Sequence, residues 1–166
     1  TFVLPSSTAT RRVRIFTPTF EMPFAGHPTL GTAHVVRELA GAGDRVTLEM
    51  KAGVIPVEAS GAVWTLQANP PKHRAPQASR VSFAAMLGLD AADIGTAPLW
   101  VDTGSDQLVI PLAYATIGTR SMAYVFAREE NHVLARFFFL KHGSPVEDPG
   151  TGSACANLGG WLLATG

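Results

Sequence analysis

The sequence contains little of what several common function classes require. Only one of its 166 residues, Cys155, is a cysteine, so no disulfide framework can form within the chain. The same count leaves no cysteine and histidine cluster at zinc-binding spacing, and it excludes a racemase that works with two facing thiols. We expect Cys155 to pack as a small buried side chain rather than to act as a nucleophile, in a cytoplasmic protein.

The chain also lacks net charge, because 13 lysines and arginines balance 13 aspartates and glutamates. No basic field would therefore draw nucleic acid or an anionic membrane surface. No apolar run reaches the roughly 18 residues that span a bilayer, no leader-like segment is present, and neither a P-loop nor a G-x-G-x-x-G turn occurs. The histidines other than His27 show no helical pairing that would hold a metal. These absences leave a small molecule as the expected partner, with no nucleic acid and no membrane.

What the chain does contain is enough apolar side chain for a packed core, since 46% of its residues are hydrophobic. The apolar patterns predict one helix from Pro28, a second from a cap at Ser82 to Leu87, and a third from Ser153. Pro56 predicts that its strand lies at a sheet edge or a bulge. Alternating and continuous apolar runs predict strands at residues 12–16, 46–50, 54–58, 63–67, 99–101, 107–112, 123–126 and 134–139.

A proline-rich passage at residues 69–76 is the best candidate for a boundary. It predicts an N-terminal lobe at residues 1–75 and a C-terminal lobe at residues 76–166. Each half would then hold strands that flank one glycine-led helix, which is a loose internal repeat. Apolar strands such as residues 137–139, if exposed, would suit a homodimer.

The first polar motif occupies residues 21–31, Glu-Met-Pro-Phe-Ala-Gly-His-Pro-Thr-Leu-Gly. His27 follows Gly26 in a turn of small residues, directly before a helix. Small residues let a bound group approach the backbone closely, and a helix N-terminus favours an anion, so the turn predicts a site for a carboxylate or an oxyanion. His27 could equally be a turn histidine bonded to backbone. Glu21 could be a second carboxylate at this turn or a solvated residue at a strand end.

The second polar motif occupies residues 147–154, Glu-Asp-Pro-Gly-Thr-Gly-Ser-Ala. Asp148 lies in a predicted loop, and Thr151 and Ser153 flank Gly152 at a helix start. As ordinary N-caps, such side chains each stabilise a helix by about 1 kcal/mol. An anion docks at the same position, so capping and binding are compatible.

The two motifs could work together. If Asp148 and His27 face each other across a cleft between the lobes, they form an acid/base or proton-relay pair whose pKa values their surroundings can tune. A third polar turn, Asp-Thr-Gly-Ser-Asp at residues 102–106, could join them or be an ordinary turn.

Residues 14–31 and 147–154 resemble the two signature motifs of the phenazine-biosynthesis PhzF-like isomerase family, and residues 102–105 with 108–111 look like its intervening turn and strand. The resemblance covers most of the chain. It implies the α+β fold of diaminopimelate epimerase, with two pseudo-symmetric lobes that each curl a mixed sheet around a central helix. It also implies a proton shift at carbon, performed without metal or organic cofactor.

The resemblance assigns roles residue by residue. His27 corresponds to the motif histidine that contacts substrate, Asp148 to the motif aspartate, and Gly152 with Ser153 to the turn that holds an anion. Related epimerases carry paired cysteines where this chain has Ala25 and Thr151, so thiol chemistry is not the implied mechanism.

The resemblance also identifies what this sequence lacks. The family's main acid/base is a glutamate that would fall immediately upstream of Thr1. The passage from residue 112 to residue 124 is shorter than the family pattern, and the closing strands would follow residue 166. We therefore expect the sequence to be a fragment or gapped.

The leading hypothesis is an isomerase that moves a proton on a small carboxylate-bearing metabolite, with Asp148 and His27 as catalytic residues and Gly26, Thr151, Gly152 and Ser153 as substrate-binding residues. A rival is a small-carboxylate binding protein that keeps the fold without chemistry. A hydrolase with Ser153 as nucleophile lacks the strand, elbow and helix that such a serine needs.

Overall fold

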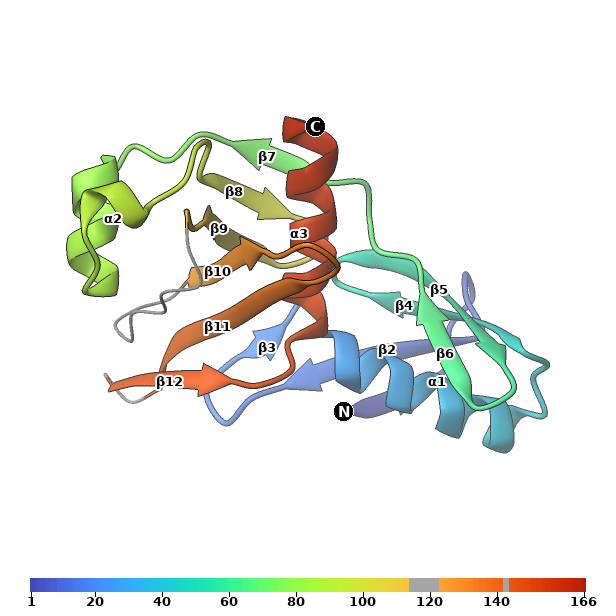
Figure 1. Ribbon diagram of the computed structural model, residues 1–166. Helices are drawn as coiled ribbons and strands as arrows, with labels where there is room; N and C mark the ends of the chain where they lie inside the picture. The colour runs from blue at the N-terminus through green and yellow to red at the C-terminus, as the bar shows by residue number, and fades with distance from the viewer. Residues whose placement is uncertain (114–122, 142–143) are drawn as a thin grey trace. The chain divides into compact units, whose positions relative to one another are not determined.

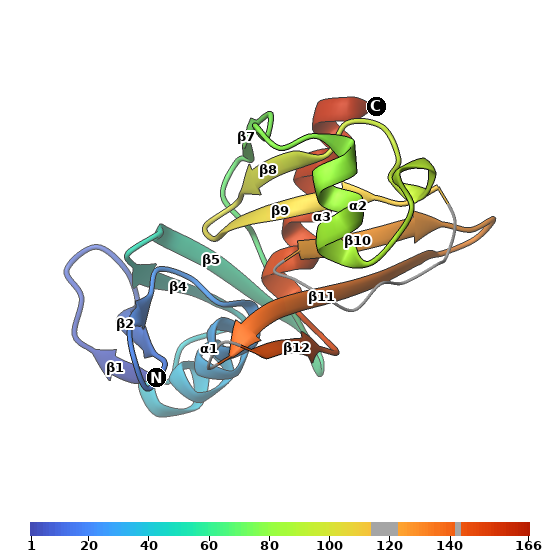
Figure 2. The ribbon, with the colours of Figure 1, turned by 90° about the vertical axis from the view of Figure 1, so that its left-hand side faces the viewer.

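The structure is a computed structural model that describes residues 1–113, 123–141 and 144–166. The chain divides into two compact units (Figures 1 and 2). Unit 1 contains Thr1–Pro70 and Thr103–Ser105, and unit 2 contains Pro71–Asp102 and Asp106–Gly166. Each unit has a mixed sheet and a helix that begins with glycine, which confirms the predicted α+β class. As domain limits, residues 1–75 and 76–166 stay a prediction, and most of the expected short passage from 112 to 124 lies outside the described residues.

Unit 1 is a sheet in the order β1-β2-β4-β5-β6, with β3 paired to β2 off this path. The β2–β4 pair is parallel and the others are antiparallel, because the chain crosses over through α1 between β2 and β4. The elements are β1 (Phe2–Leu4), β2 (Arg11–Phe16), β3 (Glu21–Met22), α1 (Gly26–Ala40), β4 (Arg45–Met50), β5 (Gly53–Ser60) and β6 (Val63–Leu66).

Helix α1 supplies one wall of the unit 1 core. Its buried residues, which include Thr29, Ala33 and Val36, recur at the three- and four-residue spacing of one helix face. Ala33 and Val36 belong to a cluster with the alternate buried residues of β2, β4 and β5. The helix ends at Gly41, whose φ of 58° is the left-handed conformation that glycine adopts at low cost.

The prediction that Pro56 marks a sheet edge is wrong. Strand β5 lies between β4 and β6, so Pro56 is in a central strand. Its carbonyl accepts a hydrogen bond from the Gln67 N–H at 2.9 Å, just beyond the last residue of β6. The side of Pro56 that has no N–H therefore faces the end of β6, where the missing donor costs few of the hydrogen bonds between β5 and β6.

Unit 2 is a sheet in the order β12-β11-β10-β9-β8-β7, in which only the β9–β10 pair is parallel. The elements are β7 (Lys72–Arg74), α2 (Arg80–Leu87), a 3-10 turn η1 (Ala91–Asp93), β8 (Leu99–Asp102), β9 (Asp106–Pro111), β10 (Ala123–Arg128), β11 (Val133–Lys141), β12 (Ser144–Asp148) and α3 (Gly152–Thr165).

Both faces of the unit 2 sheet are covered. Alternate residues of β10 enter different clusters: Val125 packs with residues of α2, whereas Tyr124 and Phe126 pack with residues of α3. A strand buried on both faces reads as a continuous apolar run, which explains why residues 123–127 carry no polar alternation.

Three expectations about unit 2 are wrong for identifiable reasons. The cap of α2 is Ser79, whose hydroxyl accepts the Ser82 N–H at 3.1 Å. Cys155 is exposed, because the buried face of α3 contains the residues on either side of it, at 153–154 and 157–158. Residues 137–139 do not form an exposed apolar strand: Phe138 is 3% exposed in the α2 cluster, and Phe137 packs in the α3 cluster. The homodimer stays a prediction without this support.

In the described part of the chain, no helix is long and apolar enough to cross a membrane.

Candidate functional site

The first motif forms the N-terminus of α1, which begins at Gly26 rather than at the predicted Pro28. Ala25 is the N-cap and has no side-chain oxygen, so the cap residue gives the first turn no side-chain acceptor. The Thr29 N–H and hydroxyl both donate to the Ala25 carbonyl, at 3.1 and 2.7 Å. The N–H groups of Gly26 and His27 therefore receive no bond from the cap side chain, and His27 is exposed at the start of the helix.

The polar turn at residues 102–106 helps to hold this first motif in place. Its central residues, Thr103–Ser105, belong to unit 1. Gly104 has a φ of 130°, and a Cβ there would lie 3.1 Å from the ring of the buried Phe24. The Asn69 N–H donates to the Thr103 carbonyl at 3.3 Å, while the Asn69 amide donates to the Ala52 carbonyl at 2.7 Å. Within unit 1 the turn packs against the residue that precedes Ala25.

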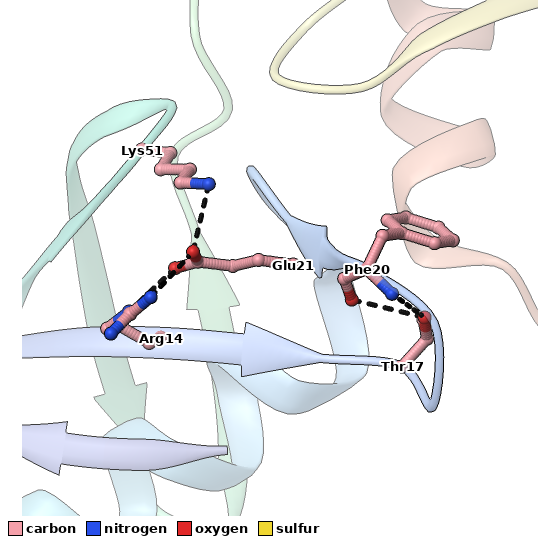
Figure 3. Close-up of polar contacts among 5 residues, drawn as sticks. All are labelled: Arg14, Thr17, Phe20, Glu21 and Lys51. Atoms are coloured by element: carbon pink, nitrogen blue, oxygen red, sulfur yellow. Dashed lines mark hydrogen bonds and ion pairs between the residues drawn. The ribbon is translucent and has the colours of Figure 1, made fainter.

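Glu21 is neither a free carboxylate nor a solvated strand end (Figure 3). It accepts two hydrogen bonds from the Arg14 guanidinium, both at 2.9 Å, and the Lys51 ammonium lies 2.9 Å away. Its side chain is only 11% exposed. The hydrogen bonds from Arg14, and then those from Lys51, lower the pKa of Glu21 to about 2. Glu21 therefore stays ionised near neutral pH, which does not suit a group that must exchange a proton there.

The second motif links β12 to α3 within unit 2. Asp148 is the last residue of β12, not a loop residue as predicted, and it is half-buried. One carboxylate oxygen accepts the Gly150 N–H at 3.3 Å, and the other accepts the Thr151 hydroxyl at 2.6 Å. These bonds fix the carboxylate against the turn that starts the helix.

The same bond changes the role of Thr151. Thr151 is the N-cap of α3, but its side chain makes no capping bond, because its hydroxyl donates to Asp148 instead. The first helical bond runs from the Cys155 N–H to the Thr151 carbonyl at 3.1 Å. The capping alternative for Thr151 is therefore wrong, and the N–H groups of Gly152 and Ser153 receive no bond from the cap side chain. A short anion is the natural acceptor for such a turn.

The sequence motifs did not indicate two residues near Ser153, Gln107 and Asn157. The Gln107 amide on β9 donates to the Ser153 hydroxyl oxygen at 3.3 Å, and the Asn157 amide donates to the Gln107 carbonyl oxygen at 2.7 Å. The four-residue spacing of Ser153 and Asn157 could have indicated a shared polar spot on one helix face. An amide cannot remove the proton that a nucleophilic serine must lose, which argues against the hydrolase hypothesis.

The predicted site residues thus fall into two groups. Gly26 and His27 are in unit 1, and Asp148, Thr151, Gly152 and Ser153 are together in unit 2. The facing pair of His27 and Asp148 stays a prediction. Among the residues that the structure describes, no three His, Cys, Asp or Glu side chains form a group that could hold a metal ion.

Several known proteins are similar to this chain in sequence. The family model described as phenazine biosynthesis-like protein, PhzC-PhzF, matches residues 1–120. An uncharacterized isomerase from Pasteurella multocida is 37% identical over 176 residues, which cover 96% of this chain and 60% of that protein. The trans-2,3-dihydro-3-hydroxyanthranilate isomerase of Pseudomonas aeruginosa is 49% identical over 57 residues, which cover 34% of this chain and 20% of that protein.

A solved structure agrees with the sequence matches. A predicted epimerase from Pseudomonas aeruginosa has a TM-score of 0.75 and 26% identity, over 98% of this chain and 65% of that one. The chain spans 60% of the length of the Pasteurella relative and 65% of the length of this structure. Since the family model covers well over half of the sequence, and the fold agrees with it, the chain belongs to the phenazine biosynthesis-like PhzC-PhzF family.

Proposed function

We propose that the complete protein is an isomerase that shifts a proton between carbon atoms of a small carboxylate-bearing metabolite. Two relatives with similar sequences are named isomerases. Gly26, Thr151, Gly152 and Ser153 bind the substrate in this proposal, and His27 and Asp148 move or position the proton. No metal or organic cofactor takes part.

The observation that carries the proposal is the hydrogen bond from the Thr151 hydroxyl to Asp148 at 2.6 Å. It turns the cap side chain away from α3, so the first-turn N–H groups are left to a ligand. The bond also gives the Asp148 carboxylate a fixed position a few residues from those donors. A proton-transfer group and an anion-binding turn are thereby held in one short segment.

This arrangement suits the charge changes of a proton shift. Removal of a proton from a carbon conjugated to a carboxylate spreads negative charge onto that carboxylate. N–H donors and the positive end of a helix stabilise this charge most strongly in the transition state. His27 adds an imidazole, a side chain that commonly serves as a general acid or base. The family resemblance assigns the main acid/base to a glutamate upstream of Thr1.

The test follows deuterium incorporation from deuterated water into a substrate, with the full-length protein. The first substrate to try is trans-2,3-dihydro-3-hydroxyanthranilate, because one relative is named for it. A panel of other small unsaturated carboxylates and amino acids follows. The replacement Asp148→Asn keeps the size of the side chain and one acceptor oxygen, so we expect the melting temperature to change little. Because an amide cannot accept the proton as a carboxylate does, we expect incorporation to fall by a factor of about 100 or more.

Asp44→Asn is the matched control, because the exposed side chain of Asp44 contacts Arg37 at 3.3 Å and belongs to neither predicted motif. It should retain full incorporation. Undiminished incorporation in Asp148→Asn would show that Asp148 has no catalytic role. Tight binding of a carboxylate, with no incorporation for any compound, would favour the non-catalytic binding protein instead.

A further inference from the structure

Gln107 occupies a position that the proposed roles leave unexplained. It lies on β9, two residues before Val109, so its side chain is on the sheet face that packs against α3. Its amide contacts two residues of that helix, Ser153 in the first turn and Asn157 one turn later. All three residues are in unit 2.

The hydrogen bonds run in one direction. The Asn157 amide donates to the carbonyl oxygen of Gln107 at 2.7 Å, and this bond turns the other end of the amide, its NH2 group, toward Ser153. That NH2 group donates to the Ser153 hydroxyl oxygen at 3.3 Å. Asn157 is fully buried, at 0% exposure, so the network is anchored in the core rather than in solvent.

The direction matters because a serine hydroxyl has only one proton. When its oxygen accepts a bond from Gln107, the proton is left to donate to another acceptor. A hydroxyl that accepts one bond also becomes a stronger donor, since bonds in a chain polarise one another. Ser153 is 7% exposed and is the second residue of α3, so its remaining donor lies beside the N–H groups of the first turn.

We propose that Gln107 is a positioning residue, which holds the Ser153 hydroxyl as a donor to the substrate carboxylate. The inference rests on the proposed function, because it needs a carboxylate at the first turn of α3. Gln107 does not touch the substrate in this account. Its effect on binding passes entirely through Ser153.

The test is a double-mutant cycle on the full-length protein, with anthranilate as the probe. Anthranilate carries a carboxylate and an amino group on a six-membered ring but has no tetrahedral carbon to react, so calorimetry measures binding alone. Ser153→Ala removes the donor and should weaken binding about tenfold or more, as expected for a bond to a charged group. Gln107→Met removes the amide without adding charge and should weaken binding severalfold.

The decisive measurement is Gln107→Met in the Ser153→Ala background. If Gln107 acts through Ser153, the second change has no further effect on the dissociation constant of anthranilate. A general packing role would instead weaken binding in both backgrounds, which would overturn the inference. Gln77→Met, at an exposed loop position, is the matched control and should bind anthranilate as the unchanged protein does.

A second variant covers the case in which Gln107→Met does not fold. Gln107→Glu keeps an oxygen for the Asn157 amide, but it offers Ser153 only an acceptor, so the hydroxyl proton turns toward residue 107. We expect binding at least as weak as in Ser153→Ala. Binding of anthranilate as tight as in the unchanged protein would overturn the inference.

The cycle separates this inference from the function on which it rests. If the unchanged protein does not bind anthranilate, or if Ser153→Ala binds it equally well, the carboxylate site at Ser153 is wrong and the role of Gln107 falls with it. If Ser153→Ala weakens binding but neither Gln107 variant does, only the role of Gln107 is wrong. For any compound that is turned over, a role that acts through Ser153 predicts that Gln107→Met changes neither KM nor kcat further in the Ser153→Ala background.

Discussion

At the scale of single residues, hydrogen-bond partners decided roles that residue type left open. Glu21 and Asp148 are both carboxylates beside a predicted anion-binding turn. Two cations surround Glu21, so it is held ionised as part of an ion network. Asp148 instead accepts bonds from the Thr151 hydroxyl and the Gly150 N–H. Residue type alone therefore could not separate a structural carboxylate from a candidate catalytic one.

The surroundings of Glu21 predict a pH dependence of stability. Its pKa of about 2 in the folded protein is below its ordinary value of 4.5, so the unfolded chain binds the proton more tightly. The stabilisation from Glu21 is fully present above pH 4.5 and is lost as the pH falls toward 2. In Glu21→Gln this contribution is absent at every pH.

Urea unfolding at several pH values, from about 6 to about 3, measures the effect. We expect the free-energy difference between the unchanged protein and Glu21→Gln to be constant above pH 4.5 and to shrink as the pH falls below it. Glu58→Gln, which breaks an exposed pair with Arg45, should give a small difference at every pH. A difference for Glu21→Gln that stays constant with pH would show that the carboxylate is not held ionised by its neighbours.

At the scale of elements, two adjacent glycines of α3 differ in their surroundings. A Cβ on Gly160 would lie 2.7 Å from the Pro71 Cβ and 2.9 Å from a methyl carbon of Val101, so the helix approaches β8 closely at this point. A Cβ on Gly159 would meet nothing within 4 Å. The two positions are therefore a matched pair with opposite expected signs.

Gly160→Ala should destabilise the protein by about 1 to 3 kcal/mol, because the added methyl group forces the helix away from β8. Gly159→Ala should stabilise it by up to about 1 kcal/mol, because alanine favours the helix and fills open space. Chemical denaturation of both variants measures the two changes. Equal changes would show that close packing at Gly160 does not hold α3 in place.

The elements also show which parts of the fold could be predicted. Periodic apolar runs correctly predicted α1, α3 and most strands, because a buried face imposes its spacing on the sequence. Strands β3, β7 and β12 were missed, since they are short or lie at a sheet edge and carry few apolar residues. The central position of Pro56 was missed because a proline is tolerated there only where the neighbouring strand β6 ends, and the sequence does not show that the two positions meet.

The candidate site was predictable in part for the same reason. The small-residue turns before α1 and α3 were visible in the sequence, and the structure places both turns at helix starts. The bond that takes the Thr151 hydroxyl, and the network through Gln107, were not visible, because they depend on side-chain direction and on residues about 50 positions apart. Local sequence could therefore predict the positions of the turns but not the hydrogen-bond partners of the Thr151 and Ser153 hydroxyls.

At the scale of the whole molecule, the proposed reaction draws on both units. His27 is at the start of α1 in unit 1, and Asp148 is at the end of β12 in unit 2. Residues that serve one proton shift are not additive in their effect on rate, because the loss of one already removes most of the step to which the other contributes. Residues that serve separate steps or separate sites multiply their effects.

This difference can be measured by deuterium incorporation with His27→Ala, Asp148→Asn and the double variant. If both residues serve the same proton shift, the double variant should be no more than a few times slower than the slower single variant. His34→Ala is the control, because His34 is a second exposed histidine of α1, near Trp64 rather than at the helix start. Multiplied losses in the double variant would assign His27 and Asp148 to different steps, and full activity in His27→Ala would leave Asp148 as the only catalytic residue among those proposed.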